Sequence, residues 1–341
     1  MIFKMKKILS VLIAFTLSFS ALAQSNEEIC REAVSLFESG DFVKSNQKFF
    51  LLYEQKYMLD LVSYYISANY YAQKEYAKAI KFASKSIKLS DSYAVKAAFV
   101  KGKSLNQIQK LFEEEDFYRQ MIKKFPDEFS LHNFLVTNLL QRKLYDKAED
   151  ELKKSISLDK FGWFAHLKLG DLNADNQLFI HAIMCYYYFI FTDNKTSRTQ
   201  EIVKKIAEIM NFNEFDRIIS MKTAREETLT KEQRDLIWAM MFFSDMKKIK
   251  FSDDGLPQMD TFIENSKKLL IDIVDGVGET PNGFYEDFYL SFFRNIIKNN
   301  FLDTFLYYAL VNVYPQINSV ITSVSKDKMS KFADFLSIEW K

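Results

Sequence analysis

The chain has 341 residues, of which 48% are hydrophobic and 16% aromatic, but only 8 are glycine and 4 are proline. So few turn-forming residues argue against a β-rich fold and favour an all-helical one. The formal net charge of +1 gives no reason to expect nucleic acid or an anionic membrane surface as a partner.

The first 23 residues have the pattern of a secretory signal peptide. Lysines precede an apolar run over residues 8–18, and Ala21 and Ala23 fit the small-x-small cleavage rule. The apolar run is too short for a comfortable membrane span, which favours cleavage before Gln24 over an uncleaved anchor. We therefore expect secretion through the Sec pathway and a periplasmic or cell-envelope location.

From about residue 26 the sequence repeats with a period of 34 to 35 residues. An aromatic residue or leucine follows each expected turn, at Phe42, Tyr76, Leu111, Tyr145 and Phe179. Three residues later comes a mostly small residue, at Ser45, Ala79, Glu114, Ala148 and Ala182. Upstream lies another mostly small position, at Ala33, Ser67, Gly102, Val136 and Gly170. Three residues beyond it a large apolar residue recurs, at Leu36, Tyr70, Leu105 and Leu139, with Asn173 as the exception.

A unit of this length holds two helices of about 14 residues and two short turns. The small positions lie where the two helices cross, and the large ones fill the space around the crossing. One such hairpin cannot bury its apolar stripe alone, so it must stack on its neighbours. The sequence predicts five units within residues 24–195, over about 26–59, 60–93, 95–128, 129–162 and 163–196.

These recurring positions resemble the signature of the tetratricopeptide repeat family. The matching residues are Ser67, Tyr70, Tyr76 and Ala79 in the second unit, Gly102, Leu105, Tyr118 and Pro126 in the third, and Gly170, Ala182 and Tyr186 in the fifth. The resemblance covers about half the chain and implies a right-handed α-solenoid followed by a C-terminal helical domain. The departures from the signature are Glu114, Asn173, His132 and His166.

After Asn194 the period fades, and residues 196–341 form a C-terminal helical region. Residues 197–225 resemble a degenerate hairpin, and further helices are expected over about 230–246, 260–274, 284–298, 301–314 and 326–339. The segment His181–Phe191 is apolar on almost every face. An exposed terminal helix should have a polar face, so we expect the C-terminal region to cover this one.

Few residues could carry catalysis or bind a metal. The three histidines all lie in the repeats, and the C-terminal region has neither histidine nor cysteine. That composition disfavours nucleophile–histidine pairs and zinc sites there, so we expect no enzyme, metal or cofactor. Cys30 and Cys185 lie four repeats apart, too far for a disulfide, and both are expected to be buried thiols.

The family resemblance implies that the first helix of each unit lines a concave groove in which partner peptides lie. The groove residues implied by the register are Tyr64, Ala68, Tyr71, Phe99, Lys103, Asn106, Asn133, Thr137, Gln141, Leu167, Asp171 and Asp175. This surface grades from aromatic, through amide and hydroxyl, to acidic. Its aromatic part would anchor a peptide and its amides would bond a peptide backbone. Alternatively, the chain's own N-terminus or tail covers these aromatic residues.

Three hypotheses about function follow. The first is a non-enzymatic protein-interaction scaffold of the bacterial cell envelope, with a protein or peptide partner, no nucleic acid and only indirect membrane association. The second is a structural subunit that docks through an exposed patch of its C-terminal region, at Phe284, Tyr285, Phe288 and Tyr289. The third is an enzyme with a helical catalytic tail.

Overall fold

The computed structural model describes residues 26–211, 239, 241–244, 246–276, 283–323 and 326–340. Their secondary structure is helical, apart from an isolated β-bridge between Phe251 and Pro257. The all-α prediction is therefore confirmed. The signal peptide, the second half of the degenerate hairpin and most of the helix over 230–246 lie outside the described residues. Among the described helices, none is both long and apolar enough to cross a membrane.

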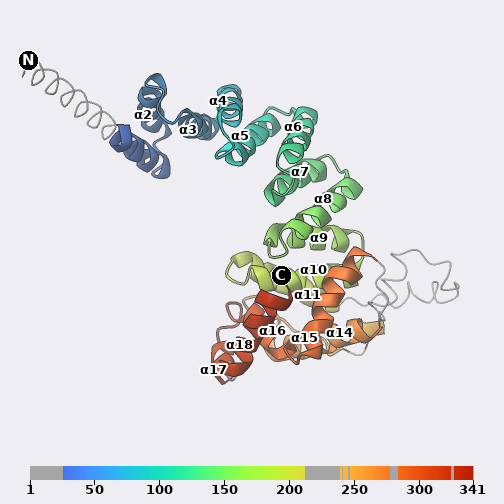
Figure 1. Cartoon of the computed structure of the whole chain (residues 1–341). Coiled ribbons are helices and arrows are strands. Elements are labelled where there is room, and N and C mark those ends of the chain that lie inside the picture. Colours follow the sequence, from blue (N-terminus) through green and yellow to red (C-terminus); the bar gives the residue numbers. More distant parts are fainter. Residues whose placement is uncertain are drawn as a thin grey trace, which may run out of the picture. The chain divides into compact units, whose positions relative to one another are not determined.

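The chain divides into two compact units, residues 1–144 (unit 1) and residues 145–341 (unit 2). In Figure 1, which is coloured along the sequence, the described part of unit 1 runs from blue to green and that of unit 2 from green to red. This division falls between the two helices of the fourth predicted repeat. The domain boundaries drawn from the sequence remain a prediction.

The helices follow the predicted period. Unit 1 contains a helix over residues 26–38, then α2 (Phe42–Glu54), α3 (Leu59–Ala72), α4 (Tyr76–Leu89), α5 (Ala94–Gln107), α6 (Leu111–Lys124) and α7 (Phe129–Gln141). Unit 2 continues with α8 (Tyr145–Leu158), α9 (Trp163–Asp175), α10 (Phe179–Thr192) and α11 (Ser197–Met210). Each of the five sequence landmarks that follow a turn is the first residue of a helix.

The turn between the two helices of each repeat hairpin has the same backbone geometry. The residue two places before each second helix has a positive φ, at Gly40, Lys74, Gln109, Lys143 and Gln177. Two hydrogen bonds close each turn; in the second repeat, Lys74 N donates to Tyr71 O at 2.9 Å and Glu75 N donates to Tyr70 O at 2.8 Å. This is the Schellman arrangement that terminates a helix. Only the first repeat uses glycine, the residue that this conformation favours.

Size complementarity fixes how closely the two helices of a hairpin approach. A Cβ built on Gly102 would lie 1.9 Å from Tyr118 Oη, and one built on Gly170 would lie 2.6 Å from the Tyr186 ring. The tyrosine stands sixteen residues after the glycine in both cases. The glycine positions therefore leave room for a ring from the partner helix.

The C-terminal region of unit 2 contains α14 (Met259–Gly276), the π-helical turn η2 (Glu286–Leu290), α15 (Ser291–Lys298), α16 (Leu302–Leu310), α17 (Ile317–Ser323), α18 (Lys326–Asp334) and the π-helical turn η3 (Phe335–Glu339). The helix expected over 284–298 is confirmed, because residues 284–285, η2 and α15 follow one another without a break and η2 is a π-helical turn inside it. The one over 301–314 is shorter, and α17 was not predicted. Among these elements, η2 and α16 pack most extensively against α10, in which residues 179–191 are all buried. The prediction that the C-terminal region covers this helix is confirmed.

Candidate functional site

The predicted groove residues fall on four first helices of the repeats. In unit 1, α3 carries Tyr64, Ala68 and Tyr71, α5 carries Phe99, Lys103 and Asn106, and α7 carries Asn133, Thr137 and Gln141. In unit 2, α9 carries Leu167, Asp171 and Asp175. Their role in binding a partner remains a prediction, but their surroundings differ sharply.

The aromatic members form a partly exposed surface in unit 1. Phe99 is 40% exposed, and its ring centroid lies 5.0 Å from that of Phe134. Tyr64 is half-buried and stacks on Tyr93 at 5.6 Å. Burial raises the pKa of the Tyr64 hydroxyl above its usual value, and the nearby Tyr93 adds a smaller rise. These rings therefore combine a fixed geometry with open apolar area, as peptide anchors require.

Two of the predicted groove residues in unit 1 belong to the interior instead. Ala68 is only 8% exposed and packs in a core cluster with Ala79 and Ala83, and Asn133 is only 9% exposed. The register placed both correctly on the first helices, but these side chains have little area left for a partner.

The amide and hydroxyl groups are largely used within unit 1. Asn106 Nδ2 donates to Glu114 Oε2 at 2.9 Å and to Gln141 Oε1 at 2.7 Å. Thr137 Oγ1 donates to Asn133 O at 3.1 Å. An amide whose two N–H groups are already bonded has no donor left for a peptide. Asn106 is therefore part of a structural network and is not an open donor, whereas a role of Asn133 and Gln141 in binding a peptide stays a prediction.

Glu114, which stands where the repeat signature has alanine, is the centre of this network. It is 2% exposed, and its Oε2 also accepts from Asn138 Nδ2 at 2.8 Å. Burial raises the pKa of the Glu114 carboxyl, and the bonds from Asn138 and Asn106 oppose that rise. The first two repeats show the same pairing, because Asn69 Nδ2 donates to Ser45 Oγ at 2.9 Å. A polar residue at the small position is thus matched by an asparagine in the next repeat.

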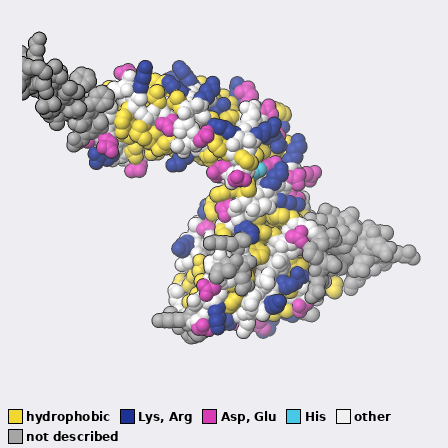
Figure 2. All heavy atoms as spheres, in the orientation of Figure 1, with side chains coloured by type: hydrophobic (Ala, Val, Ile, Leu, Met, Phe, Trp, Pro, Cys, Tyr) yellow, Lys and Arg dark blue, Asp and Glu magenta, His cyan; other side chains and the backbone are white. Residues whose placement is uncertain are grey.

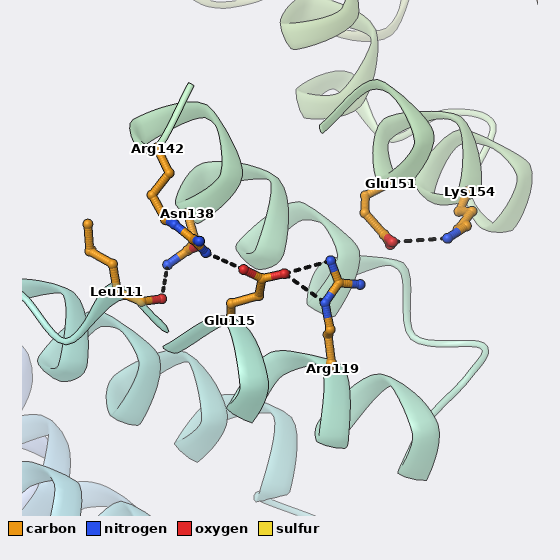
Figure 3. A network of polar contacts seen from close by, with 7 residues as sticks. All are labelled: Leu111, Glu115, Arg119, Asn138, Arg142, Glu151 and Lys154. Atoms are coloured by element: carbon orange, nitrogen blue, oxygen red, sulfur yellow. Dashed lines mark hydrogen bonds and ion pairs between the residues drawn. The ribbon is translucent and has the colours of Figure 1, made fainter. Parts of the chain in front are cut away.

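A charged network lies beside it in unit 1. Figure 3 shows Glu115 between Arg119 and Arg142; its Oε1 accepts from Arg119 Nε at 2.9 Å, and its Oε2 binds Arg142. The Arg142 guanidinium lies 4.1 Å from the ring centroid of Phe112, which is 73% exposed. The arginine is thereby held over a ring that faces solvent.

At the acidic end of the predicted groove, in unit 2, Asp171 is neutralised internally, whereas Asp175 is exposed. Asp171 accepts hydrogen bonds from Tyr186 Oη at 3.1 Å and Lys205 Nζ at 3.0 Å, and it contacts Lys168 Nζ at 3.2 Å. Leu167 is 8% exposed and belongs to the core. Asp171 thus links α9 to α10 and α11 by hydrogen bonds, and little of its negative charge is left for a partner.

Two departures from the repeat signature bind the C-terminal region. His166 is fully buried; its Nδ1 lies 2.7 Å from Tyr289 Oη, and its Nε2 lies 2.8 Å from Lys160 O. Burial lowers the pKa of His166 to about 3, so the ring is neutral at physiological pH. Asn173 Nδ2 donates to Tyr285 Oη at 3.0 Å. The fifth repeat is therefore adapted to hold the tail.

The tyrosines of α10 complete the attachment. Tyr187 Oη donates to Ser266 Oγ at 2.6 Å, and Trp340 Nε1 donates to Tyr188 Oη at 2.8 Å. Tyr285 and Tyr289 are 2% and 0% exposed. The four aromatic residues proposed as an exposed docking patch thus do not form one: two are buried, and Phe284 and Phe288 are half-buried and stack on each other at 5.9 Å.

Neither cysteine is in a disulfide. Cys185 is buried, as expected, and burial raises its thiol pKa to about 12, whereas Cys30 is only half-buried and corrects the expectation for that residue. His132 and His181 are buried at 5% and 6% exposure, and His181 meets the Tyr285 ring edge-on at 4.3 Å. No cluster of three potential metal ligands occurs among the described residues.

No protein-family model matches the chain, and no curated protein matches it either. Solved structures with a similar backbone arrangement include PilF of Pseudomonas aeruginosa. It has 15% identity and a TM-score of 0.47, and the match covers 62% of this chain and 96% of that one. A double mutant of MamA from strain RS-1 has 14% identity and a TM-score of 0.42, covering 50% and 94%. A fragment of MamA from Desulfovibrio magneticus RS-1, from residue 41 to its end, has 14% identity and a TM-score of 0.39, covering 50% and 93%.

PilF and MamA are both tetratricopeptide-repeat proteins. Superpositions this loose support no statement about function, so the fold rests on the chain's own geometry. That geometry consists of the helix period, the common turn and the glycine–tyrosine crossings. By these features, the repeat region has the fold of the tetratricopeptide type.

Proposed function

We propose that the chain is a non-enzymatic interaction scaffold that binds a peptide or protein segment on the aromatic face of α3 and α5 in unit 1. The observation that carries this proposal is the unequal use of the repeat surfaces. In the fifth repeat, polar and aromatic side chains bond the chain's own C-terminal region, whereas Phe99 in unit 1 is 40% exposed. We define the binding face as Tyr64, Tyr71, Phe99 and Lys103.

The chemistry of this face suits an extended or helical segment with apolar side chains. Tyr64 and Tyr71 are half-buried, and Tyr71 packs against Tyr76 at 5.8 Å, which limits the rotamer entropy lost on binding. Lys103 Nζ lies 5.8 Å from the Phe99 ring centroid and adds a charge at the edge. Aromatic anchors ringed by polar groups are typical binding hot spots.

The test is a pair of single substitutions in the full chain. Phe99→Ala should weaken partner capture by tenfold or more, because aromatic hot spots are worth about 2 kcal/mol or more. The matched control is Phe112→Ala, which removes a more exposed ring, at 73%, outside the face. Captured partners are quantified by mass spectrometry after pull-down from the envelope fraction, and both melting curves are recorded. Equal loss of capture in the two variants, or none in Phe99→Ala, would contradict the proposal.

We further propose that the protein works in the cell envelope, on the basis of the signal-peptide pattern in residues 1–23. Fractionation and N-terminal sequencing of the native protein test this proposal. A mature chain that begins at Gln24 supports it, and an intact Met1 in the cytoplasmic fraction contradicts it.

A further inference from the structure

The segment over residues 74–110 in unit 1 is strongly basic, although the whole chain is almost neutral. It contains nine lysines, no arginine, and only two acidic residues, Glu75 and Asp91. Both acids already have a lysine partner: Glu75 lies 3.3 Å from Lys78 Nζ, and Asp91 lies 2.5 Å from Lys124 Nζ. Most of the positive charge of this segment is therefore not balanced within it.

Four of the nine lysines form one stripe along α4, which we call the α4 stripe: Lys78, Lys81, Lys85 and Lys88. Spacings of three, four and three residues place them on one side of the helix, opposite the buried residues Ala79, Ala83 and Ser86. The helix has no acidic residue. Solvated helix faces ordinarily mix both signs in i,i+4 pairs. In the described part of the chain, no carboxylate lies within ion-pair distance of Lys81, Lys85 or Lys88.

The stripe lies over half-buried aromatic rings instead of carboxylates. Lys85 Nζ is 4.2 Å from the ring centroid of Tyr53 and donates to its hydroxyl, and Lys81 Nζ is 5.9 Å from that of Phe82. Lys78 Nζ is 5.3 Å from the ring centroid of Tyr70. These rings also pack on one another: Tyr53 and Tyr70 lie 5.6 and 5.8 Å from Phe82.

An aromatic face attracts an ammonium group but leaves its net charge in place. Each lysine is thereby held near a fixed position and can still bind an anion. Figure 2 shows Lys and Arg side chains along the upper edge of unit 1, interspersed with Asp and Glu side chains and beside apolar area. The combination of oriented charge and half-exposed rings differs from an ordinary solvated helix face.

We propose that the α4 stripe, with the rings of Tyr53, Tyr70 and Phe82, is a second docking surface that binds an acidic segment of a partner polypeptide. Charge complementarity determines the choice of partner. Ten residues of helix span about 15 Å, so carboxylates spaced by three or four residues on an acidic helix match the stripe. The rings beneath offer apolar contact to the same segment. The surface shares no residue with the binding face of α3 and α5.

The absence of arginine favours a carboxylate-bearing partner over a nucleic acid. Phosphate and base recognition relies heavily on the planar, bidentate guanidinium group, whereas lysine acts as a point charge. None of the nine basic residues over 74–110 is an arginine.

The test uses the full chain and a fluorescein-labelled 15-residue peptide with glutamate at every third or fourth position and two leucines. Binding is measured by fluorescence anisotropy at low salt. The triple variant Lys81→Gln, Lys85→Gln and Lys88→Gln should bind about tenfold more weakly, because each exposed pair contributes a modest amount. The matched control is Lys44→Gln, Lys48→Gln and Lys123→Gln, which removes the same charge from unit 1 outside the stripe and should lose less than threefold.

The contribution of the rings is tested separately with Phe82→Leu, which keeps every charge and an apolar side chain. It should weaken peptide binding by about threefold, because a cation–π contact and apolar area are lost while the helix is retained. Circular dichroism melts show whether each variant is folded at the assay temperature.

Several results would overturn the proposal. One is an equal loss of peptide binding in the stripe variant and the control variant. Another is tighter binding of a 15-nucleotide single-stranded DNA or of phosphatidylglycerol vesicles than of the peptide. A third is self-association of the wild-type chain in sedimentation that the stripe variant abolishes, since the occupant would then be a second copy.

Discussion

The repeat hairpins and the tail hairpin formed by α15 and α16 share one turn but differ in how their helices cross. Asn300 has φ 57°, two residues before α16 begins at Leu302, as in every repeat. Asn300 N donates to Ile297 O at 2.9 Å and Phe301 N donates to Ile296 O at 2.8 Å, which reproduces the repeat turn.

The side chains at the crossing are different. Counted from this turn, Phe293 stands where the fifth repeat has Gly170, and Phe305 stands where it has Ala182. Their ring centroids lie 5.7 Å apart, and Ala309 occupies the place of Tyr186. The tail hairpin thus places bulk where the repeats place small residues. A common turn fixes the reversal of the chain, whereas residue size at the crossing decides how closely the helices approach.

The largest expected effect comes from adding bulk at a repeat crossing. Gly102→Ser should destabilise unit 1 by about 3 kcal/mol, because the new Cβ would overlap Tyr118. The second repeat has Ser67 and Ala83 at these two positions. The double variant Gly102→Ser with Tyr118→Ala copies that pair, so it should be more stable than the sum of the single effects predicts, by at least about 1 kcal/mol.

Urea unfolding of the four proteins completes this double-mutant cycle. Strict additivity of the two single changes would show that Gly102 and Tyr118 are not coupled. Phe293→Ser with Phe305→Ala in the tail serves as the contrast: both changes should simply leave cavities, costing several kcal/mol in total, without mutual relief.

The repeats could be predicted because their signal is local and periodic. The landmarks Phe42, Tyr76 and Leu111 each begin a helix, and the small and large positions recur with the same period, apart from Glu114 and Asn173. Such positions follow from helix geometry alone, so one sequence suffices to find them. The covered state of α10 could be predicted for the same reason, since a helix without a polar face must be buried.

The hydrogen bonds made by the residues that depart from the repeat signature could not be predicted. Glu114, His166 and Asn173 disagree with the signature and read in the sequence as weakened repeats. In the structure they bond Asn138, Tyr289 and Tyr285, which lie 24, 123 and 112 residues away along the chain. The separation of 24 residues recurs between Ser45 and Asn69, but the other two pairs join a repeat to the C-terminal region, where no repeat period applies. Hydrogen-bond pairing also leaves no trace in composition. The interior position of Asn133 and the saturated amide of Asn106 were missed for the same reason.

An intermediate effect is expected from acid, and it should act on unit 2 through His166. The folded-state pKa of about 3 lies below the ordinary value of 6.5, so the unfolded chain binds the proton more readily. The contribution of His166 to the free energy of unfolding is therefore complete above pH 6.5. Between pH 6.5 and pH 3 this contribution decreases by about 1.4 kcal/mol for each pH unit. At pH 5 the loss should be about 2 kcal/mol.

The measurement is urea unfolding between pH 7.5 and pH 5, followed by tryptophan fluorescence. The matched variant is His166→Gln, which keeps a hydrogen-bonding side chain but cannot titrate. It should be less stable at pH 7.5 and should show a flatter pH profile. The same slope in the wild type and in His166→Gln would rule out this histidine as the source of the acid sensitivity.

The smallest expected effect concerns the turn that both kinds of hairpin share. Lys74 adopts φ 62° although its Cβ disfavours the left-handed region, so Lys74→Gly should stabilise unit 1 by about 1 kcal/mol. Asn300→Gly should gain less, about 0.5 kcal/mol or below, because asparagine tolerates this conformation better than lysine does. Gly40→Ala should lower the stability of unit 1, because alanine disfavours the backbone conformation at φ 84°. The added Cβ itself meets no atom within 4 Å, so this effect comes from the backbone alone. Melting temperatures of the three variants give the order directly, and an equal gain at positions 74 and 300 would show that side-chain identity does not matter in this turn.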